Sequence, residues 1–519
     1  MAGSMRRFFR CNRRLAGRLA AACCAVGVAS TLFAASADTR LVRAVRNKDA
    51  AAVRALLKEH VDVNAPQGDG STALHWAAHV DELAIAEILL RAGARPNTAN
   101  GNGFTPLHLA CTNRSASMVE RLLSAAADAN AASPNGETVL MTCARAGDAK
   151  AVKALLVHGA RVNDKEKSHG QTALMWAAAQ SHPDVVQLLT EAGADVKARS
   201  RAYAQTVVSE ETQRAGREEL NYTVLRGGST PLLFTARVGD AESARLLLNA
   251  GADPNDSMPD GMSALVLAVY SGHGNVGELL LEKGADPNAF GTGYSALHAA
   301  VLKSDAAVVK ALLARGANPN VAMTKGTPIR RDTTDYNLPK TLIGSTPYLL
   351  AARFLEPEIM RALAAGGAEV KATLPNGTTP LMLAAGMGSS PTDDRRGIAT
   401  IDFGKVEPES RVLDTVKAAV ELGADVNTAN QAGDTALHSA AVLGHDTVVQ
   451  WLADHGAQLN VKNNRGQTPL AALLASGLGR RYAAAAVAAG GADPTGVEPP
   501  RETPHPTTVA LLRKLGGTE

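Results

Sequence analysis

The stretch TALHWAAH at residues 72–79 places two histidines four residues apart, with a tryptophan between them. On a helix, residues i and i+4 share one face, so His75 and His79 could hold a metal ion. The stretch is not unique, because similar ones begin at Thr105, Thr138, Thr172, Thr230, Ser263, Ser295, Thr346, Thr379, Thr435 and Thr468. Most of them start 32 to 34 residues after the previous one, and this period indicates a solenoid of stacked repeats.

Each copy continues in the same way after its first Thr or Ser, which we call the signature residue. A polar residue such as His182 lies ten positions later, then a Leu pair such as Leu89 and Leu90, then Gly-Ala-Asp-x-Asn, as at residues 251–255. The order predicts a short helix, a turn, a longer helix, a glycine stop and an extended finger. Ala126 stands where nine other copies carry glycine, so it either adopts the left-handed conformation or ends its helix differently.

These stretches resemble the ankyrin repeat, whose signature T-P-L-H-x-A they match. The resemblance covers roughly residues 39–494, with a degenerate first copy at Thr39, and implies an all-α repeat solenoid of about twelve copies with hairpin fingers. It also implies that a histidine three residues after the signature residue hydrogen-bonds backbone between neighbouring repeats. We therefore expect a structural role, and no metal site, for Thr72, His75, Thr105, His108, Thr435 and His438.

The first 37 residues have a different composition. They contain six Arg and no Asp or Glu, and they end in an apolar run and the sequence Ala35-Ser36-Ala37. This pattern predicts a secretory signal peptide that is cleaved before Asp38, and hence a periplasmic or secreted protein. The pair Arg6-Arg7 leaves a twin-arginine route open, and a mitochondrial transit peptide or an uncleaved anchor remains an alternative. We expect no membrane span in the mature chain.

The charge of the chain limits the classes of partner that it can bind. Removal of the six signal Arg leaves 47 basic against 50 acidic residues, and this balance argues against a nucleic-acid partner.

Cys111 and Cys143 are the only cysteines outside the signal, and we expect them to be separate buried thiols. The reason is that stacked helices lie about 8 to 10 Å apart, whereas a disulfide needs Cα atoms within about 7 Å. No motif for nucleophilic, metal-dependent or nucleotide chemistry is present, so we expect no catalysis and no cofactor.

Three longer steps interrupt the period, near residues 199–228, 321–343 and 387–410. The resemblance places the first two in fingers and the third between the two helices of one repeat, at the opposite rim. The first two insertions carry Tyr203, Tyr222 and Tyr336, and tyrosine is favoured at interfaces. Alternatively, the insertions pack on their own repeats and bind nothing. Residues 495–519 are expected to form a Pro-rich linker and a C-terminal helix.

The resemblance also implies that residues seven and eight positions after each signature residue lie on the concave surface. We call the charged, polar and aromatic members the concave row: Arg145, Gln180, Arg237, Tyr270, Lys303, Arg353 and Phe354. Its basic and aromatic character on a slightly acidic chain favours a partner surface that is acidic with apolar anchors. The alternative is that these residues are ordinary solvated helix ends.

Together these patterns predict an exported, monomeric scaffold without catalytic activity that binds a protein partner through its concave row and long fingers. The competing interpretation is an accessory subunit of an exported enzyme, or a small-ligand binder whose insertions cover the groove.

Overall fold

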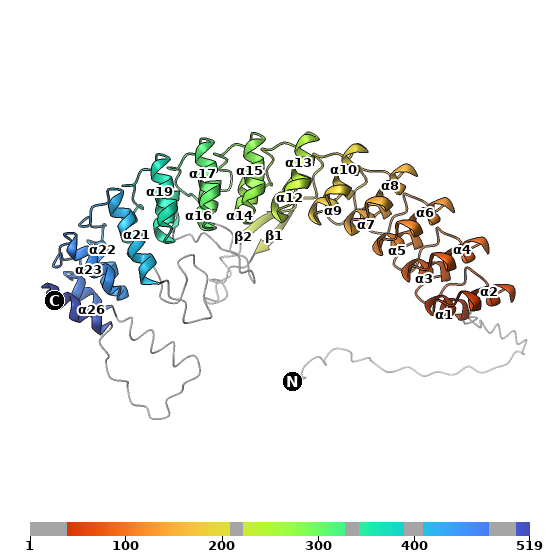
Figure 1. Cartoon of the computed structure of the whole chain (residues 1–519), viewed down its shortest axis with the longest axis horizontal. Helices are drawn as coiled ribbons and strands as arrows, with labels where there is room; N and C mark the ends of the chain where they lie inside the picture. Colours follow the sequence, from red (N-terminus) through yellow and green to blue (C-terminus); the bar gives the residue numbers. More distant parts are fainter. Residues whose placement is uncertain (1–38, 208–221, 327–341, 389–407, 477–504) are drawn as a thin grey trace, which may run out of the picture.

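The computed structural model describes residues 39–207, 222–326, 342–388, 408–476 and 505–519, which form an arc of stacked helix pairs (Figure 1). The first helices are α1 (Arg40–Arg46), α3 (Ala73–His79), α5 (Pro106–Thr112), α7 (Val139–Ala146), α9 (Ala173–Ala179), α12 (Pro231–Val238), α14 (Ala264–Tyr270), α16 (Ala296–Leu302), α18 (Pro347–Arg353), α20 (Pro380–Ala384), α22 (Ala436–Leu443) and α24 (Pro469–Ala475). The second helices are α2 (Ala50–Lys58), α4 (Leu83–Arg91), α6 (Ala116–Ser124), α8 (Ala149–Val157), α10 (Pro183–Glu191), α13 (Ala241–Asn249), α15 (Gly274–Glu282), α17 (Ala306–Ala314), α19 (Pro357–Ala365), α21 (Glu409–Glu421) and α23 (Asp446–Asp454). The predicted repeat solenoid is confirmed.

Side-chain caps explain where the helices begin. The hydroxyl of Thr138 accepts the N–H of Met141 at 3.3 Å in α7, and Thr172 caps α9 in the same way. The carboxylate of Asp148 accepts the N–H of Ala151 at 3.1 Å and starts α8. Each cap satisfies a backbone donor that the first turn of a helix leaves without a partner.

Left-handed residues explain where the second helices end. Gly93 has φ +88°, and the equivalent glycines of the other repeats share this conformation. Ala126 has φ +61° and His60 of the first repeat has φ +58°, so the two copies without a glycine use the same backbone turn rather than another helix end. A residue with a Cβ adopts this left-handed conformation at a cost in free energy.

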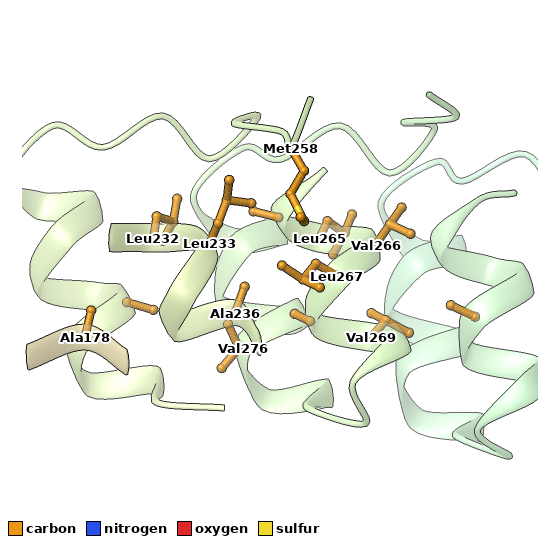
Figure 2. Close-up of a cluster of buried hydrophobic side chains, with 14 of the residues drawn as sticks. Ala178, Leu232, Leu233, Ala236, Met258, Leu265, Val266, Leu267, Val269 and Val276 are labelled. Atoms are coloured by element: carbon orange, nitrogen blue, oxygen red, sulfur yellow. The ribbon is translucent and has the colours of Figure 1, made fainter. Parts of the chain in front are cut away.

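One apolar core runs through the stack. Leu232 and Leu265 of neighbouring first helices are buried, as are Ala236 and the second-helix residue Val276 (Figure 2). Small residues let the helices approach closely, and each repeat covers the apolar face of the next.

A series of asparagines joins consecutive repeats along the finger side. Asn64 donates to Gly93 O at 3.1 Å and accepts the N–H of Arg95 at 2.8 Å, so one side chain connects two repeats. We call this series the asparagine ladder, and it continues at Asn97, Asn130, Asn163, Asn255, Asn288, Asn320, Asn427 and Asn460. Lys197 and Lys371 occupy the same position in two repeats.

The first insertion contains a hairpin of β1 (Tyr203–Val207) and β2 (Tyr222–Arg226), which lies on the inner side of the arc (Figure 1). Arg199 fixes its base, because its guanidinium donates to Gly228 O and Ser257 O, both at 2.9 Å, and pairs with Asp256. Residues 208–221 of this insertion, 327–341 of the second and 389–407 of the third lie outside the described residues.

The last helix, α26 (Pro506–Leu515), packs on α23 and α24, as second helices do elsewhere in the stack. His505 precedes it, just as His182 precedes α10, and Gly516 ends it with φ +97°. Asn460 donates to Gly516 O at 3.2 Å, so the asparagine ladder reaches this helix. The array was predicted to end at residue 494, whereas α26 packs on it as a further second helix.

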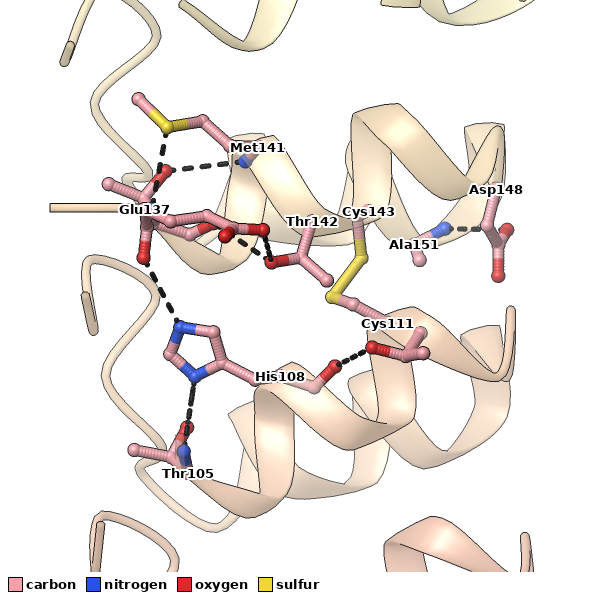
Figure 3. The surroundings of a disulfide bond; sticks show 11 residues. Thr105, His108, Cys111, Glu137, Met141, Thr142, Cys143, Asp148 and Ala151 are labelled. Atoms are coloured by element: carbon pink, nitrogen blue, oxygen red, sulfur yellow. Dashed lines mark hydrogen bonds between the residues drawn. A yellow bond between two sulfur atoms is a disulfide. The ribbon is translucent and has the colours of Figure 1, made fainter. Parts of the chain in front are cut away.

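Cys111 of α5 and Cys143 of α7 form a disulfide, so the expectation of separate thiols is wrong (Figure 3). Their Cα atoms are 4.6 Å apart. The expectation used the distance between helix axes, but a Cα lies about 2.3 Å from its own axis. Two Cα atoms on facing sides of axes about 8 to 10 Å apart can therefore approach to about 4 to 5 Å.

Candidate functional site

The N-terminal part of the concave row combines an ion pair with a ring contact. Arg145 lies in the last turn of the first helix α7, and the first helices line the inner side of the arc (Figure 1). Its guanidinium lies 2.9 Å from the carboxylate of Glu137 and 5.1 Å from the ring centroid of Trp176. Gln180 follows α9 and is exposed. The cation is thus held over an aromatic face, a favourable arrangement for both groups.

Further along, the concave row contains a second cation–ring pair. The ring of Tyr270, at the end of α14, lies 6.1 Å from that of Tyr294. The Lys303 ammonium lies 5.5 Å from the centroid of Tyr270. Arg237 lies in the last turn of α12, one repeat earlier. A cation, an aromatic ring and a cation, from Arg237, Tyr270 and Lys303, therefore lie on three consecutive repeats.

The C-terminal end of the row differs from the prediction at one residue. Arg353 donates to Gly388 O at 3.0 Å and remains on the inner side. Phe354 is only 2% exposed, so it belongs to the core and we remove it from the site. Spacing fixes the backbone position, but a side chain at a helix end can turn inward, where a benzyl group gains free energy by leaving water.

Two tryptophans beside the row were not predicted as part of the site. Trp76 and Trp176 lie four positions after their signature residues and are half-buried. Arg46 lies 4.6 Å from the ring centroid of Trp76, and Gln67 accepts the indole N–H at 2.8 Å. The signal was present in the composition, because the chain has three Trp and two of them share this position.

Acidic residues are absent from these positions of the first helices. No copy carries Asp or Glu four, seven or eight positions after its signature residue. The finger residue Glu137, which lies near the row, is paired with Arg145. The helical part of the concave surface is therefore basic and aromatic.

The hairpin presents one of the three predicted tyrosines. Tyr203 in β1 is 46% exposed, and so is its neighbour Leu225 in β2. The backbone of Tyr222 lies in β2, and Tyr336 lies outside the described residues.

The signature histidines are part of the scaffold. Nδ1 of His75 accepts the N–H of Thr72 at 3.0 Å, and its Nε2–H donates to Phe104 O of the next repeat at 3.0 Å. His108 bonds Thr105 and the finger of the next repeat in the same way (Figure 3), and so does His438 with Thr435. Burial lowers the pKa of His108 to about 4, so the ring is neutral at pH 7.

Neither a metal site nor a membrane span emerges from the described residues. His79 is exposed and meets the edge of Trp76, with centroids 5.4 Å apart. In the part of the chain that the structure describes, no three His, Cys, Asp or Glu side chains are grouped as ligands for a metal ion. Across the same ranges, no helix has the length and apolarity to cross a bilayer.

Comparison with known proteins gives matches over much of the array. A family model described as ankyrin repeats (3 copies) matches residues 41–133, 117–200, 214–291, 232–323 and 409–495. Protein PhlB of Serratia liquefaciens is 38% identical over 96 residues, which are 18% of this chain and 42% of PhlB. The Neurogenic locus Notch protein of Drosophila melanogaster is 34% identical over 114 residues, 21% of this chain and 4% of Notch.

Among solved structures, the human ASB11 ankyrin repeat domain is 25% identical, with a TM-score of 0.39. The match covers 48% of this chain and 98% of that domain. The chain spans less than half the length of either curated relative.

Proposed function

Because the chain belongs to the ankyrin repeat family, we propose that it is an exported scaffold without catalytic activity that binds a protein partner on its concave surface. One observation carries the proposal: cations and aromatic rings line the first helices, and no carboxylate interrupts them at the same positions. Such a surface favours a partner with acidic and apolar groups.

The central repeats and the hairpin form the proposed contact area. Arg237, Tyr270, Lys303 and Arg353 lie on consecutive repeats, so with helices about 8 to 10 Å apart they extend over roughly 30 Å. This length suits a protein interface of standard size. The hairpin of β1 and β2, which carries the exposed Tyr203, lies on the same inner side of the arc.

Two independent features support export. Residues 1–37 have the composition of a signal peptide. The two cysteines beyond that segment are joined in a disulfide, and such bonds persist mainly in oxidising compartments outside the cytosol. A periplasmic or secreted location satisfies both features.

Reversal of charge tests the contact surface. We expect Arg237→Glu with Lys303→Glu and Arg353→Glu to raise the Kd for a partner purified with the exported protein at least tenfold. Slower association and a weaker salt dependence should cause the change, since charged groups mainly set the association rate. Tyr270→Ala should instead speed dissociation.

A matched control separates position from net charge. Arg54, Lys150 and Lys310 are exposed on second helices, which lie on the outer side of the arc. Their triple reversal to Glu changes the net charge equally and should leave the Kd within twofold. Equal effects of the two triple variants, with native circular dichroism, would reject the concave surface as the binding site.

A further inference from the structure

A hollow with a volume of about 420 Å³ lies at the C-terminal end of the array. Its walls are formed by residues 386–388, which follow α20, by the first helices α22 and α24, and by the fingers that precede α22 and α24. The hollow is open to solvent. Its volume falls in the usual range for ligand pockets, about 300 to 1,000 Å³.

The sequence explains why the groove is hollow here. Four and seven positions after the signature residue, α22 carries Ser439 and Val442, and α24 carries Ala472 and Ala475. In several earlier repeats one or both of these positions carry a large side chain, as at Trp76, Trp176, Phe234, Arg237 and Tyr270. Small residues at consecutive positions therefore leave space that bulky ones fill elsewhere.

The hollow is lined by two kinds of residue. We call its apolar lining residues the floor: Met387, Val442, Leu443, Ala472 and Ala475. We call its polar lining residues from the fingers the rim: Asp434, Asn463, Arg465 and Gln467.

The rim residues differ in whether their polar groups have hydrogen-bond or ion-pair partners. Asp434 accepts from the amide of Asn463 at 2.8 Å, and the Oδ1 of Asn463 accepts the backbone N–H groups of Arg465 and Gln467, both at 3.0 Å. Arg465 is exposed, and no carboxylate among the described residues pairs with its guanidinium. The rim therefore offers a cation beside an apolar floor.

We propose that the hollow receives a bulky apolar side chain of a protein partner, while Arg465 binds a carboxylate that the partner carries next to it. This inference rests on the proposed function and specifies an anchor for it. Interfaces commonly concentrate their affinity where a large side chain fills a pocket. Arginine suits the adjacent carboxylate because its planar group donates two parallel hydrogen bonds.

Two observations favour a polypeptide over a small molecule. The hollow is open, whereas small-molecule sites usually enclose most of their ligand. It is also continuous with the concave row, because Arg353 donates to Gly388 O on the hollow's wall at 3.0 Å. A small carboxylic acid with an apolar group would offer the hollow the same apolar and acidic groups, so the experiment includes one.

The test fills the hollow with a larger side chain and makes the same substitution at an equivalent position in another repeat as a control. Ala475 and Ala179 each end a seven-residue first helix, seven positions after the signature residue. Random twelve-residue peptides displayed on phage are selected on the full exported protein. We expect the selected peptides to carry an aromatic or large aliphatic residue within two positions of Asp or Glu. Ala475→Trp should raise the Kd of a synthetic selected peptide at least tenfold, and Ala179→Trp less than twofold.

The carboxylate is tested separately. Arg465→Gln should weaken the peptide about fivefold, and this loss should vanish when the acidic residue of the peptide is replaced by its amide. Native circular dichroism of each variant excludes unfolding as the cause. N-acetyl-phenylalanine, used as the free acid, should bind at least a hundredfold more weakly than the peptide.

The proposal is overturned if the selected peptides bind Ala475→Trp as tightly as the wild type, or if the free acid binds as tightly as the peptide. The proposed function fails separately, when reversal of Arg237, Lys303 and Arg353 leaves the purified partner's Kd unchanged. A partner that needs the concave row but tolerates Ala475→Trp rejects the anchor alone.

Discussion

Ala126 ends α6 in a left-handed conformation, with φ +61°, that residues with a Cβ adopt at a cost. We expect Ala126→Gly to raise the free energy of unfolding by about 1 kcal/mol, measured by urea denaturation. The adjacent Ala125 has φ −94°, so Ala125→Gly should destabilise the protein and serves as the control. A loss of stability for Ala126→Gly would contradict the assigned cost.

The buried histidines make stability depend on pH. Burial lowers the pKa of His298 to about 4, whereas an unfolded histidine titrates near 6.5. Between these values the unfolded chain binds a proton that the folded chain does not, so stability is full above about pH 6.5 and falls as the pH falls. For His298 alone the loss from pH 7 to pH 5 is about 2 kcal/mol.

His298→Gln should therefore reduce the difference in unfolding free energy between pH 7 and pH 5 by about 2 kcal/mol. Replacement of the exposed His79 by Gln should leave that difference unchanged. The measurement is urea denaturation at both pH values, and an undiminished difference for His298→Gln would show that this ring titrates equally in both states.

Single residues also show what sequence reasoning can and cannot reach. The roles of Thr72 and His75 follow from a repeated motif, and the structure shows their bonds to each other and to the next repeat. The burial of Phe354 does not follow, because spacing places a backbone but not a side chain. Trp76 and Trp176 were not predicted, because they lie four positions after the signature residue, whereas the concave row was defined by positions seven and eight.

At the scale of helices, one covalent bond joins two neighbours. Cys111 and Cys143 lie 32 residues apart in sequence, and both are buried between α5 and α7. In the chain-entropy account, closing a loop of this length stabilises the protein by about 3.5 to 4 kcal/mol. The double variant Cys111→Ala with Cys143→Ala should lose about that amount in urea denaturation.

A reducing agent gives the matching control. Dithiothreitol should lower the stability of the wild type towards that of the double variant and leave the double variant unchanged. Equal stability of oxidised and reduced wild type would show that the bond adds nothing.

The hairpin illustrates a limit at the same scale. The spacing located the first insertion, yet it did not predict β1 and β2. Their sequences, YAQTV and YTVLR, favour strands, but fourteen residues separate them, so no short turn marks a hairpin.

The whole molecule was predictable as an array, because repetition multiplies a weak local pattern into a strong one. The place of α26 was harder to see, since residues 477–504 separate it from α24. A signal exists in the pair His505-Pro506, which repeats His182-Pro183 at the start of α10. The binding surface is the least predictable part, because it depends on a partner that the chain does not encode.

Export makes a prediction for the complete chain. If residues 1–37 are a cleaved signal, the protein isolated from its native compartment begins at Asp38, as intact-mass spectrometry can establish. Replacement of Ala35 and Ala37 by bulky residues should block cleavage and add the mass of the signal. A mature protein that retains Met1 would contradict the signal peptide.

The asparagine ladder also determines how the molecule responds to tension. Pulled from its ends, a chain of equivalent joints lengthens in equal steps, and one 33-residue repeat released as extended chain adds about 110 to 120 Å. Lys371 replaces a joint asparagine, whereas the other such lysine, Lys197, is followed by the anchoring Arg199, so the first rupture is expected at Lys371. The Cys111–Cys143 disulfide prevents the chain between the two cysteines from extending, so one step is shorter in oxidised than in reduced protein.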